Sequence, residues 1–282
     1  MILIATCSEY PHPTPNLDAL LTALRELGAE ADFLPWKTTG VETFAAADAV
    51  LPLCCWDYYD EPQRFLNWID ALEEAGVKLL NSPALLRWNF RKTYLLEMAA
   101  SGIPVPKTFH LPEAGSQVVA DRMEQEEWQT AVLKPVSSQS GHGVQKLDWA
   151  ERHRWSVDGL SGEMLLQEFQ SDIGALGETT MTFIDGTFSH AVRRVLPCGE
   201  WRANDQFGIT YERVVLGQDM IDAGAACLAH LPHTPLYARV DGIARDSGFM
   251  LNELELIEPY LYLEFAPGSA KRMAQAVLDR IG

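Results

Sequence analysis

A predicted β-hairpin centred on Asp246-Ser247-Gly248 restricts the fold most strongly, because its strands carry charged residues on one face. Glycine at the end of a three-residue loop suits the left-handed backbone that such a turn requires. This loop would pair Asp241 with Glu253 and Arg239 with Glu255. Because side chains alternate along a strand, these four would share one face, and the apolar residues between them would enter a core.

Three carboxylates on one face repel one another, and two like charges about 4 Å apart cost roughly 4 kcal/mol at an effective dielectric near 20. Solvent, protons or bound cations must relieve this repulsion. Clustered carboxylates suit Mg²⁺ that is held together with substrate phosphates, so Asp241, Glu253 and Glu255 are candidate metal ligands. The alternative is a solvated sheet face with an Arg239–Glu255 cross-strand pair, and the hairpin alone does not decide between the two.

The composition excludes several classes of partner. The 282 residues carry a formal net charge of −17, which argues against nucleic acid and anionic membranes as partners. No apolar run reaches the length of a transmembrane helix, and the chain begins with a strand-like segment, so we expect a cytoplasmic protein. The 5 cysteines lack the spacing of a zinc site or of a disulfide framework.

Residues 1–88 are predicted to form a small parallel α/β domain. Strands are expected at 1–6, 31–35, 49–53 and 77–80, with a helix after the N-cap residue Asn16 and another at 61–76. Loops at 7–15 and 54–60 follow strands, where open α/β sheets bind ligands. The second loop contains Trp56, Asp57 and Tyr58, which suit an ammonium-bearing ligand or packing against a neighbouring domain, and Cys7 in the first is expected to be a buried thiol.

A lysine at the end of a strand marks a second candidate site. Residues 131–135 are predicted to form a strand with Lys134 near its end, followed by a serine- and glycine-rich loop at 136–144. An ammonium group, hydroxyls and unhindered backbone N–H groups together bind phosphate, although a flexible hairpin is an equal alternative. Lys92 precedes this strand on a predicted helix that runs from 83 to 102.

The remainder predicts two further domains, at 89–166 and 167–282. A strand is expected at 163–169, and Asp185-Gly186 is typical of a two-residue turn in a hairpin from 177 to 195. A loop at 197–208 contains Arg202. Helices are predicted at 217–231 and 269–281.

These pieces, in this order, resemble the ATP-grasp superfamily over nearly the whole chain, in particular its glutathione-synthetase-like and D-alanine–D-alanine-ligase-like members. The resemblance rests on the helix with Lys92, the strand ending in Lys134, the glycine-rich loop and the acidic hairpin. It implies an α/β (α+β ATP-grasp) fold with a small parallel N-terminal domain, a central lid domain and a C-terminal, mostly antiparallel sheet with helices. The one departure is Glu255, where the best-known ligases have asparagine.

The resemblance implies ATP and Mg²⁺ as cofactors, and a role for each site residue. Phosphate contacts would come from Lys92, Lys134, Ser138, Gln139, Gly141 and Gly143. The adenine and ribose would be bound by Gln167, Glu168, Phe169 and Glu178. Two Mg²⁺ ions would be held by Asp241, Glu253 and Glu255, with Glu253 bridging them. Charge on the transferring phosphoryl group would be stabilised by Arg239, and phosphate or the substrate carboxylate would be bound by Arg202 together with Arg193 or Arg194.

The implied activity is an ATP-dependent carboxylate–amine ligase that converts ATP to ADP and phosphate. Its substrate would be a small amino-acid-like molecule, activated as an acyl phosphate before a C–N bond forms. Three segments, 81–83, 185–191 and 253–262, resemble the short ATP-grasp proteins that include a D-cycloserine-forming cyclo-ligase acting on O-ureido-D-serine, so intramolecular ring closure is one alternative. A non-catalytic ATP sensor is another, which the intact lysines and Arg239 disfavour. A homodimer is among the assemblies allowed, since dimers are common among these ligases.

Overall fold

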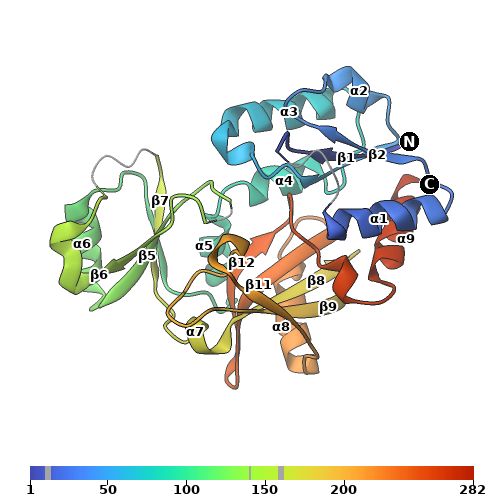
Figure 1. Cartoon of the computed structure of the whole chain (residues 1–282). Coiled ribbons are helices and arrows are strands. Elements are labelled where there is room, and N and C mark those ends of the chain that lie inside the picture. The colour runs from blue at the N-terminus through green and yellow to red at the C-terminus, as the bar shows by residue number, and fades with distance from the viewer. Residues whose placement is uncertain (10–13, 140, 158–161) are drawn as a thin grey trace.

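The computed structural model describes residues 1–9, 14–139, 141–157 and 162–282, which form three sheets (Figure 1). The predicted α/β class is confirmed, with one parallel sheet and two antiparallel ones. The three-domain division at residues 88 and 166 stays a prediction. Among the described residues, no helix is both long and apolar enough to cross a membrane.

The N-terminal sheet is parallel and has the order β2-β1-β3. Its strands are β1 (Ile2–Thr6), β2 (Ala31–Pro35) and β3 (Ala49–Cys54). They alternate with α1 (Pro15–Glu26), α2 (Val41–Ala45) and α3 (Pro62–Glu74). β1 and β3 are buried along their whole length, as expected for strands covered on both faces.

Two local predictions for this part were wrong. The predicted strand at 77–80 contributes only the isolated bridge between Val50 and Leu79. The N-cap of α1 is Thr14, whose side chain accepts a hydrogen bond from the Leu17 amide. Asn16 is instead buried inside the helix, and its Oδ1 accepts a hydrogen bond from the Leu263 amide at 3.2 Å.

The central sheet is antiparallel, has the order β4-β7-β5-β6 and forms a lobe of its own on the left of Figure 1. Its strands are β4 (Thr108–Leu111), β5 (Thr130–Pro135), β6 (Gln145–Asp148) and β7 (Met164–Glu168). α6 (Ser116–Gln125) packs on it through Val119 and Met123, which join its apolar core. Two 3-10 helices, at Tyr58–Asp60 and Trp149–Arg154, complete the N-terminal and central parts.

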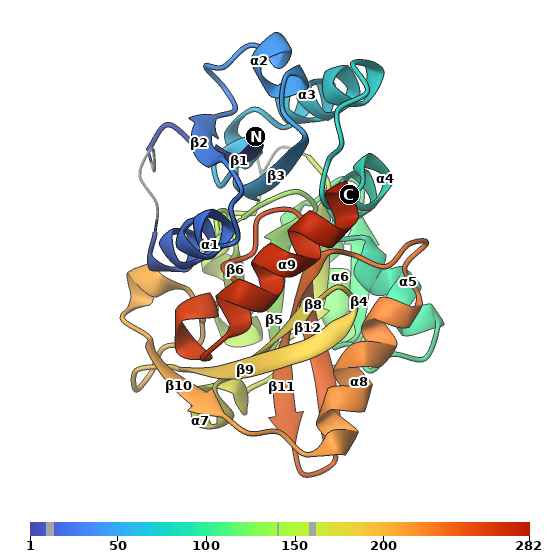
Figure 2. The same ribbon diagram turned by 90° about the vertical axis from the view of Figure 1, so that its right-hand side faces the viewer.

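The C-terminal sheet is antiparallel and has the order β10-β9-β8-β11-β12. Its strands are β8 (Glu178–Ile184), β9 (Thr187–Val195), β10 (Thr210–Val214), β11 (Tyr237–Arg245) and β12 (Gly248–Glu255). Helix α8 (Gln218–Ala229) packs on the face that carries Met181 and Phe183, and α9 (Ser269–Ile281) packs against Ile184 and Tyr237 on the opposite face (Figure 2). The short helix α7 (Ile173–Leu176) precedes β8, and 3-10 turns occur at Asp205–Phe207 and Leu263–Phe265.

The predicted register of the acidic hairpin is confirmed, because Arg239 pairs with Glu255 and Asp241 with Glu253. The predicted three-residue loop was wrong. Arg245 pairs with Gly248, which leaves a two-residue turn, and a bulge beyond Asp241 shifts the register by one residue. The two differences cancel at the acidic end, since one extra residue in a strand offsets one fewer in the loop.

The predicted single helix at 83–102 was also wrong. Two helices, α4 (Pro83–Asn89) and α5 (Tyr94–Ala100), are separated by a break that contains Lys92. The Lys92 amide donates to the Val136 carbonyl at 2.8 Å, so a contact with a distant segment replaces a helical hydrogen bond there.

The segment that contains this break lies along the free edge of β12. Asn89 donates to the Leu254 carbonyl at 2.7 Å and accepts from the Leu256 amide at 2.8 Å. The Tyr94 hydroxyl contacts both the carbonyl and the amide of Leu254 at 2.9 Å. Because Asn89 and Tyr94 flank the break on both sides, they fix Lys92 against the charged hairpin.

Candidate active site

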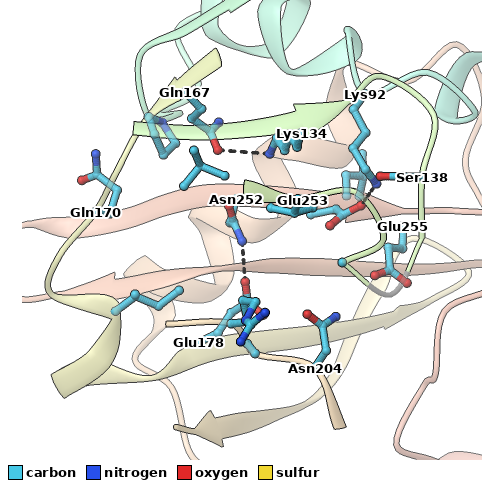
Figure 3. Close-up of a pocket in the computed structure, with 18 of the residues that line it drawn as sticks. Lys92, Lys134, Ser138, Gln167, Gln170, Glu178, Asn204, Asn252, Glu253 and Glu255 are labelled. Atoms are coloured by element: carbon cyan, nitrogen blue, oxygen red, sulfur yellow. Dashed lines mark hydrogen bonds and ion pairs between the residues drawn. The ribbon is translucent and has the colours of Figure 1, made fainter. Parts of the chain in front are cut away.

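One pocket brings together residues from the central sheet, the C-terminal sheet and the break between α4 and α5 (Figure 3). It is lined by twelve of the predicted site residues: Lys92, Lys134, Ser138, Gln139, Gly141, Gln167, Glu168, Phe169, Glu178, Arg202, Glu253 and Glu255. Gly143, Arg239 and Asp241 are not among the lining residues, and the latter two lie behind the pocket wall.

The two lysines approach the pocket from different elements and differ in their partners. Lys92 forms an ion pair with Glu253, and the Lys134 ammonium donates to Gln167 Oε1 at 3.0 Å (Figure 3). Burial opposes the charge of Lys92, but the carboxylates of Glu253, Glu255 and Glu258 outweigh it and raise its pKa. Burial lowers the pKa of Lys134 to about 8. The negative charge of Glu253 opposes this shift, and the positive charge of the nearby Lys92 adds to it. Both cations are therefore available to bind phosphate near neutral pH.

The acidic residues face arginines. The Asp241 carboxylate accepts from Arg239 Nη2 at 2.8 Å, from Arg194 Nη2 at 3.1 Å and from Thr180 Oγ1 at 3.0 Å. Arg239 also forms an ion pair with Glu255. Among the described residues, no three His, Cys, Asp or Glu side chains are grouped closely enough to hold a metal ion in this arrangement.

The donor set nevertheless fits Mg²⁺. Glu253 and Glu255 both line the pocket, and their side chains are 28% and 22% exposed. Burial raises the pKa of Glu255 to about 7. The positive charge of Arg239 opposes this shift, while the negative charges of Asp241 and Glu253 add to it. Carboxylate oxygens are the ligands that Mg²⁺ prefers, and a cation would relieve this repulsion.

Glu178 is held at the pocket wall by two contacts. Arg194 Nη1 lies 2.7 Å from one of its carboxylate oxygens, and Asn252 donates to the other at 2.6 Å. The bulge in β12 allows Asn252 and its neighbour Glu253 both to line the pocket, although consecutive strand residues normally point to opposite faces (Figure 3). Of the two arginines left open by the sequence, Arg194 lines the pocket, whereas the Arg193 side chain pairs with Glu212.

Apolar groups line the end of the pocket near the strand β7. Val132, Ile173, Ile243 and Met250 accompany the predicted hinge residues there. The ring of Phe169 packs edge-on against Trp201 at 6.0 Å, and Lys146 lies 4.4 Å from the Phe169 centroid. A flat apolar slot bounded by Gln167 and Glu168 suits an aromatic base.

The glycine-rich loop lies against two other parts of the chain, and residue 140 within it is outside the described residues. Gly141 has φ +71°, and a Cβ there would lie 2.9 Å from Asn204 Oδ1. The His142 ring is 4.9 Å from the ring of Tyr59 in the N-terminal part. Arg202 lines the pocket beside this loop, and Glu200 accepts from its Nε at 2.9 Å.

Several lining residues were not predicted as site residues, including Asn89, Asn204, Asn252 and Glu258. Glu258 had a signal, because it follows Glu253 and Glu255 directly before a proline, while the others depend on tertiary contacts. Tyr58 of the N-terminal loop does line the pocket. Asp57 instead accepts from Trp36 Nε1 at 2.6 Å, and Cys7 is buried in the core as expected.

Comparison with known proteins finds a family model, a relative and a crystal structure whose descriptions all concern cycloserine synthesis. The family model of the N-terminal domain of D-cycloserine synthetase DcsG matches residues 2–81. The cycloserine biosynthesis protein DcsG of Streptomyces lavendulae is 28% identical over 286 residues, which cover 94% of each chain. The crystal structure of D-cycloserine synthetase DcsG superimposes with a TM-score of 0.86 at 27% identity and covers 100% of both chains.

More distant structures share the fold. The D-alanine–D-alanine ligase of Bacillus anthracis has a TM-score of 0.68 at 16% identity, covering 99% of this chain and 96% of that one. The ATP-grasp ligase PsnB, in a complex with Mg and ADP, has a TM-score of 0.68 at 16% identity, covering 100% and 98%. The resemblance found in the sequence is thus confirmed. The chain is an ATP-dependent ligase that forms a C–N bond.

Proposed function

We propose that this ligase closes a ring within a single small amino-acid-like substrate, of the O-ureido-serine type, to form cycloserine. The observation that carries the proposal is the likeness to D-cycloserine synthetase over the whole of both chains, at 27% identity. Structures with 16% identity, by contrast, support the fold alone.

The proposed chemistry begins with activation of the substrate carboxylate. A carboxylate oxygen attacks the γ-phosphorus of ATP, so ADP leaves and an acyl phosphate forms. Lys92 and Lys134 bind the phosphates, and the loop from Ser138 to Gly143 closes over them. Arg239, held behind the wall by Asp241, stabilises the developing negative charge.

Mg²⁺ would be held by Glu253 and Glu255, with Asp241 behind them, and would neutralise charge on the transferring phosphoryl group. Two ions would be the proposed stoichiometry, with Glu253 among the residues that would hold them. For this to occur, Lys92 must exchange its ion pair with Glu253 for a phosphate, which the negative charge of ATP favours.

Ring closure completes the reaction. The ureido nitrogen that is bonded to oxygen attacks the acyl carbon, phosphate leaves, and an N-carbamoyl cyclic amide is formed. Water then hydrolyses the carbamoyl group, which leaves as CO2 and NH3, and cycloserine remains. Gln167, Glu168 and Phe169 hold the adenine, Glu178 the ribose, and Arg202 the substrate near the loop. We place the substrate in the pocket between Asn204 and Tyr58, which both line it.

Phosphate release tests the proposal. The protein is incubated with Mg²⁺ and ATP and with O-ureido-D-serine, D-serine or simple carboxylates, each with and without an added amine. Phosphate release with O-ureido-D-serine alone, together with a cyclic product detected by its mass, is expected. Release only with a second amine would indicate a two-substrate ligase instead. ATP binding without phosphate release across the panel would favour the sensor.

The matched variant is Glu253→Gln, which keeps the side-chain size and removes the charge. It should lower turnover by about 10²-fold or more, since electrostatic groups at a transition state contribute on that scale. Full activity in this variant would refute the metal assignment.

A further inference from the structure

The carboxylate of Glu258 differs from the other acidic groups around the pocket. Its residue is only 5% exposed, yet it lines the pocket. The neighbouring acidic groups each face a cation: Glu253 faces Lys92, Glu255 faces Arg239, and Glu178 and Asp241 face Arg194. Within the described part of the chain, no hydrogen-bond donor or ion-pair partner contacts the Glu258 carboxylate, and a buried carboxylate without a partner is costly.

Main-chain contacts fix the position of Glu258. Trp56 Nε1 donates to the Glu258 carbonyl at 2.9 Å, and this joins the N-terminal loop to the segment after β12. Pro259 follows and restricts the backbone. The side chain therefore points from a defined backbone into the pocket, at the boundary between the N-terminal part and the acidic hairpin.

Glu258 lines the same pocket as Lys92, Glu253 and Glu255, the residues proposed to bind phosphate and Mg²⁺. Burial, together with the carboxylates of Glu255 and Glu253, raises the pKa of this carboxyl well above its ordinary value, while the charges of Lys92 and Arg239 oppose the shift. Three of these residues, Lys92, Glu253 and Glu255, line the pocket in which phosphoryl transfer is proposed. The adenine slot, lined by Gln167 to Phe169, belongs to the opposite end.

An α-amino acid would bring the missing cation. Its ammonium group and its carboxylate are attached to the same carbon, so a carboxylate placed for phosphorylation beside Glu253 and Glu255 puts the ammonium within a short reach of it. Tyr58 and Asn89 also line this pocket. A buried carboxylate with free acceptor oxygens is the complement of an –NH₃⁺ group with three donors.

We infer that Glu258 binds the α-ammonium group of the substrate and thereby makes this ligase specific for α-amino acids over plain carboxylic acids. The inference rests on the proposed function, since it assumes that a small carboxylate is activated in this pocket. It adds to it a class of substrate and the residue that selects it.

The test compares two substrates and two proteins. O-ureido-D-serine and its analogue without the amino group, 3-(ureidooxy)propanoate, are assayed by phosphate release with wild type and with Glu258→Gln. Wild type should prefer the amino substrate by about 10- to 100-fold in kcat/KM, the range of one charge-assisted hydrogen bond. Glu258→Gln should lose this preference, mainly through KM for the amino substrate, and should leave the analogue almost unaffected.

Two controls make the outcome interpretable. Glu264→Gln removes an exposed carboxylate outside the pocket lining, which accepts from the Tyr260 hydroxyl, and should leave both substrates unchanged. Glu258→Asp, which keeps the charge, should retain part of the preference. Folding of each variant is checked by circular dichroism.

Three results would overturn the inference. One is equal loss of turnover on both substrates in Glu258→Gln, which would indicate a structural or general catalytic role. The second is an unchanged preference in that variant. The third is that Glu258→Gln binds fewer Mn²⁺ ions than wild type in the presence of ADP, as counted by electron paramagnetic resonance. This result would make Glu258 a metal ligand, and the measurement needs no substrate. Absence of wild-type turnover on every carboxylate would instead refute the proposed function.

Discussion

Replacing Glu255 by glutamine should change how the binding of Mg²⁺ depends on pH. This residue stands where the best-known ATP-grasp ligases have asparagine, so this chain has a titratable group where they have a neutral one. Its side chain is 22% exposed and forms an ion pair with Arg239. Burial raises its pKa to about 7, and repulsion from Asp241 and Glu253 adds to the effect of burial, while Arg239 opposes it.

The magnitude follows from the ionised fraction. A carboxyl with a pKa of about 7 is about one-tenth ionised at pH ~6 and about nine-tenths ionised at pH ~8. Because a carboxylate must lose its proton to bind a metal, the Mg²⁺ affinity should rise about tenfold over this range, about 1.4 kcal/mol. The sign is fixed by the direction of the shift: acid protonates Glu255 and weakens binding, and base strengthens it.

Isothermal titration with Mg²⁺ in the presence of saturating ADP measures this dependence. Wild type should show the rise from pH ~6 to pH ~8, on top of the titration of ADP itself, which both proteins share. In Glu255→Gln the additional rise should be absent. If the variant kept the same pH dependence as wild type, the titrating group would be another residue, and the reasoning from burial and repulsion at Glu255 would be refuted.

Two further substitutions separate stability from ligand binding. Asn81 is buried and bonds four main-chain groups, at Leu236, Tyr237 (twice) and Leu256, with donor–acceptor distances from 2.6 to 3.4 Å. Asn81→Ala should therefore lower the free energy of unfolding by about 2–6 kcal/mol in urea, while the exposed Asn67→Ala changes it by less than about 0.5 kcal/mol. Lys134→Met should weaken ATP binding about tenfold or more in a fluorescence titration, because a buried ammonium is lost. It should leave the unfolding free energy nearly unchanged, since within residues 1–9, 14–139, 141–157 and 162–282 only Gln167 accepts a hydrogen bond from this ammonium. Unchanged ATP affinity would refute the phosphate role of Lys134.

The local features of the sequence were sufficient for much of the fold. Alternation of strands and helices predicted the N-terminal sheet, and side-chain alternation predicted that Asp241 faces Glu253. The hairpin register was correct although the loop was wrong, because the bulge at β12 compensated for the shorter turn. The pairing deduced from the loop length was therefore correct at the charged end only because of the bulge, which the sequence did not reveal.

Contacts between distant segments were not predictable in the same way. The apolar spacing from Leu85 to Met98 continues at helical intervals, so nothing local marks the break at Lys92. The break exists because Val136, far along the chain, accepts the hydrogen bond of the Lys92 amide. Similarly, Arg194 could not be chosen over Arg193 until the strand β9 was placed beside Glu178.

The edge of β12 has a consequence for assembly. An outermost strand normally offers unpaired main-chain groups on which another chain can add a strand. Here the Leu251 amide donates to the Pro104 carbonyl at 2.8 Å, and the groups of Leu254 and Leu256 are bonded by Asn89, Tyr94 and Asn81. Three side chains and the Pro104 carbonyl therefore occupy the place of a sixth strand. Copies of this protein that associate must do so through another surface, and the strand that carries the proposed metal ligands is protected from intermolecular β-pairing.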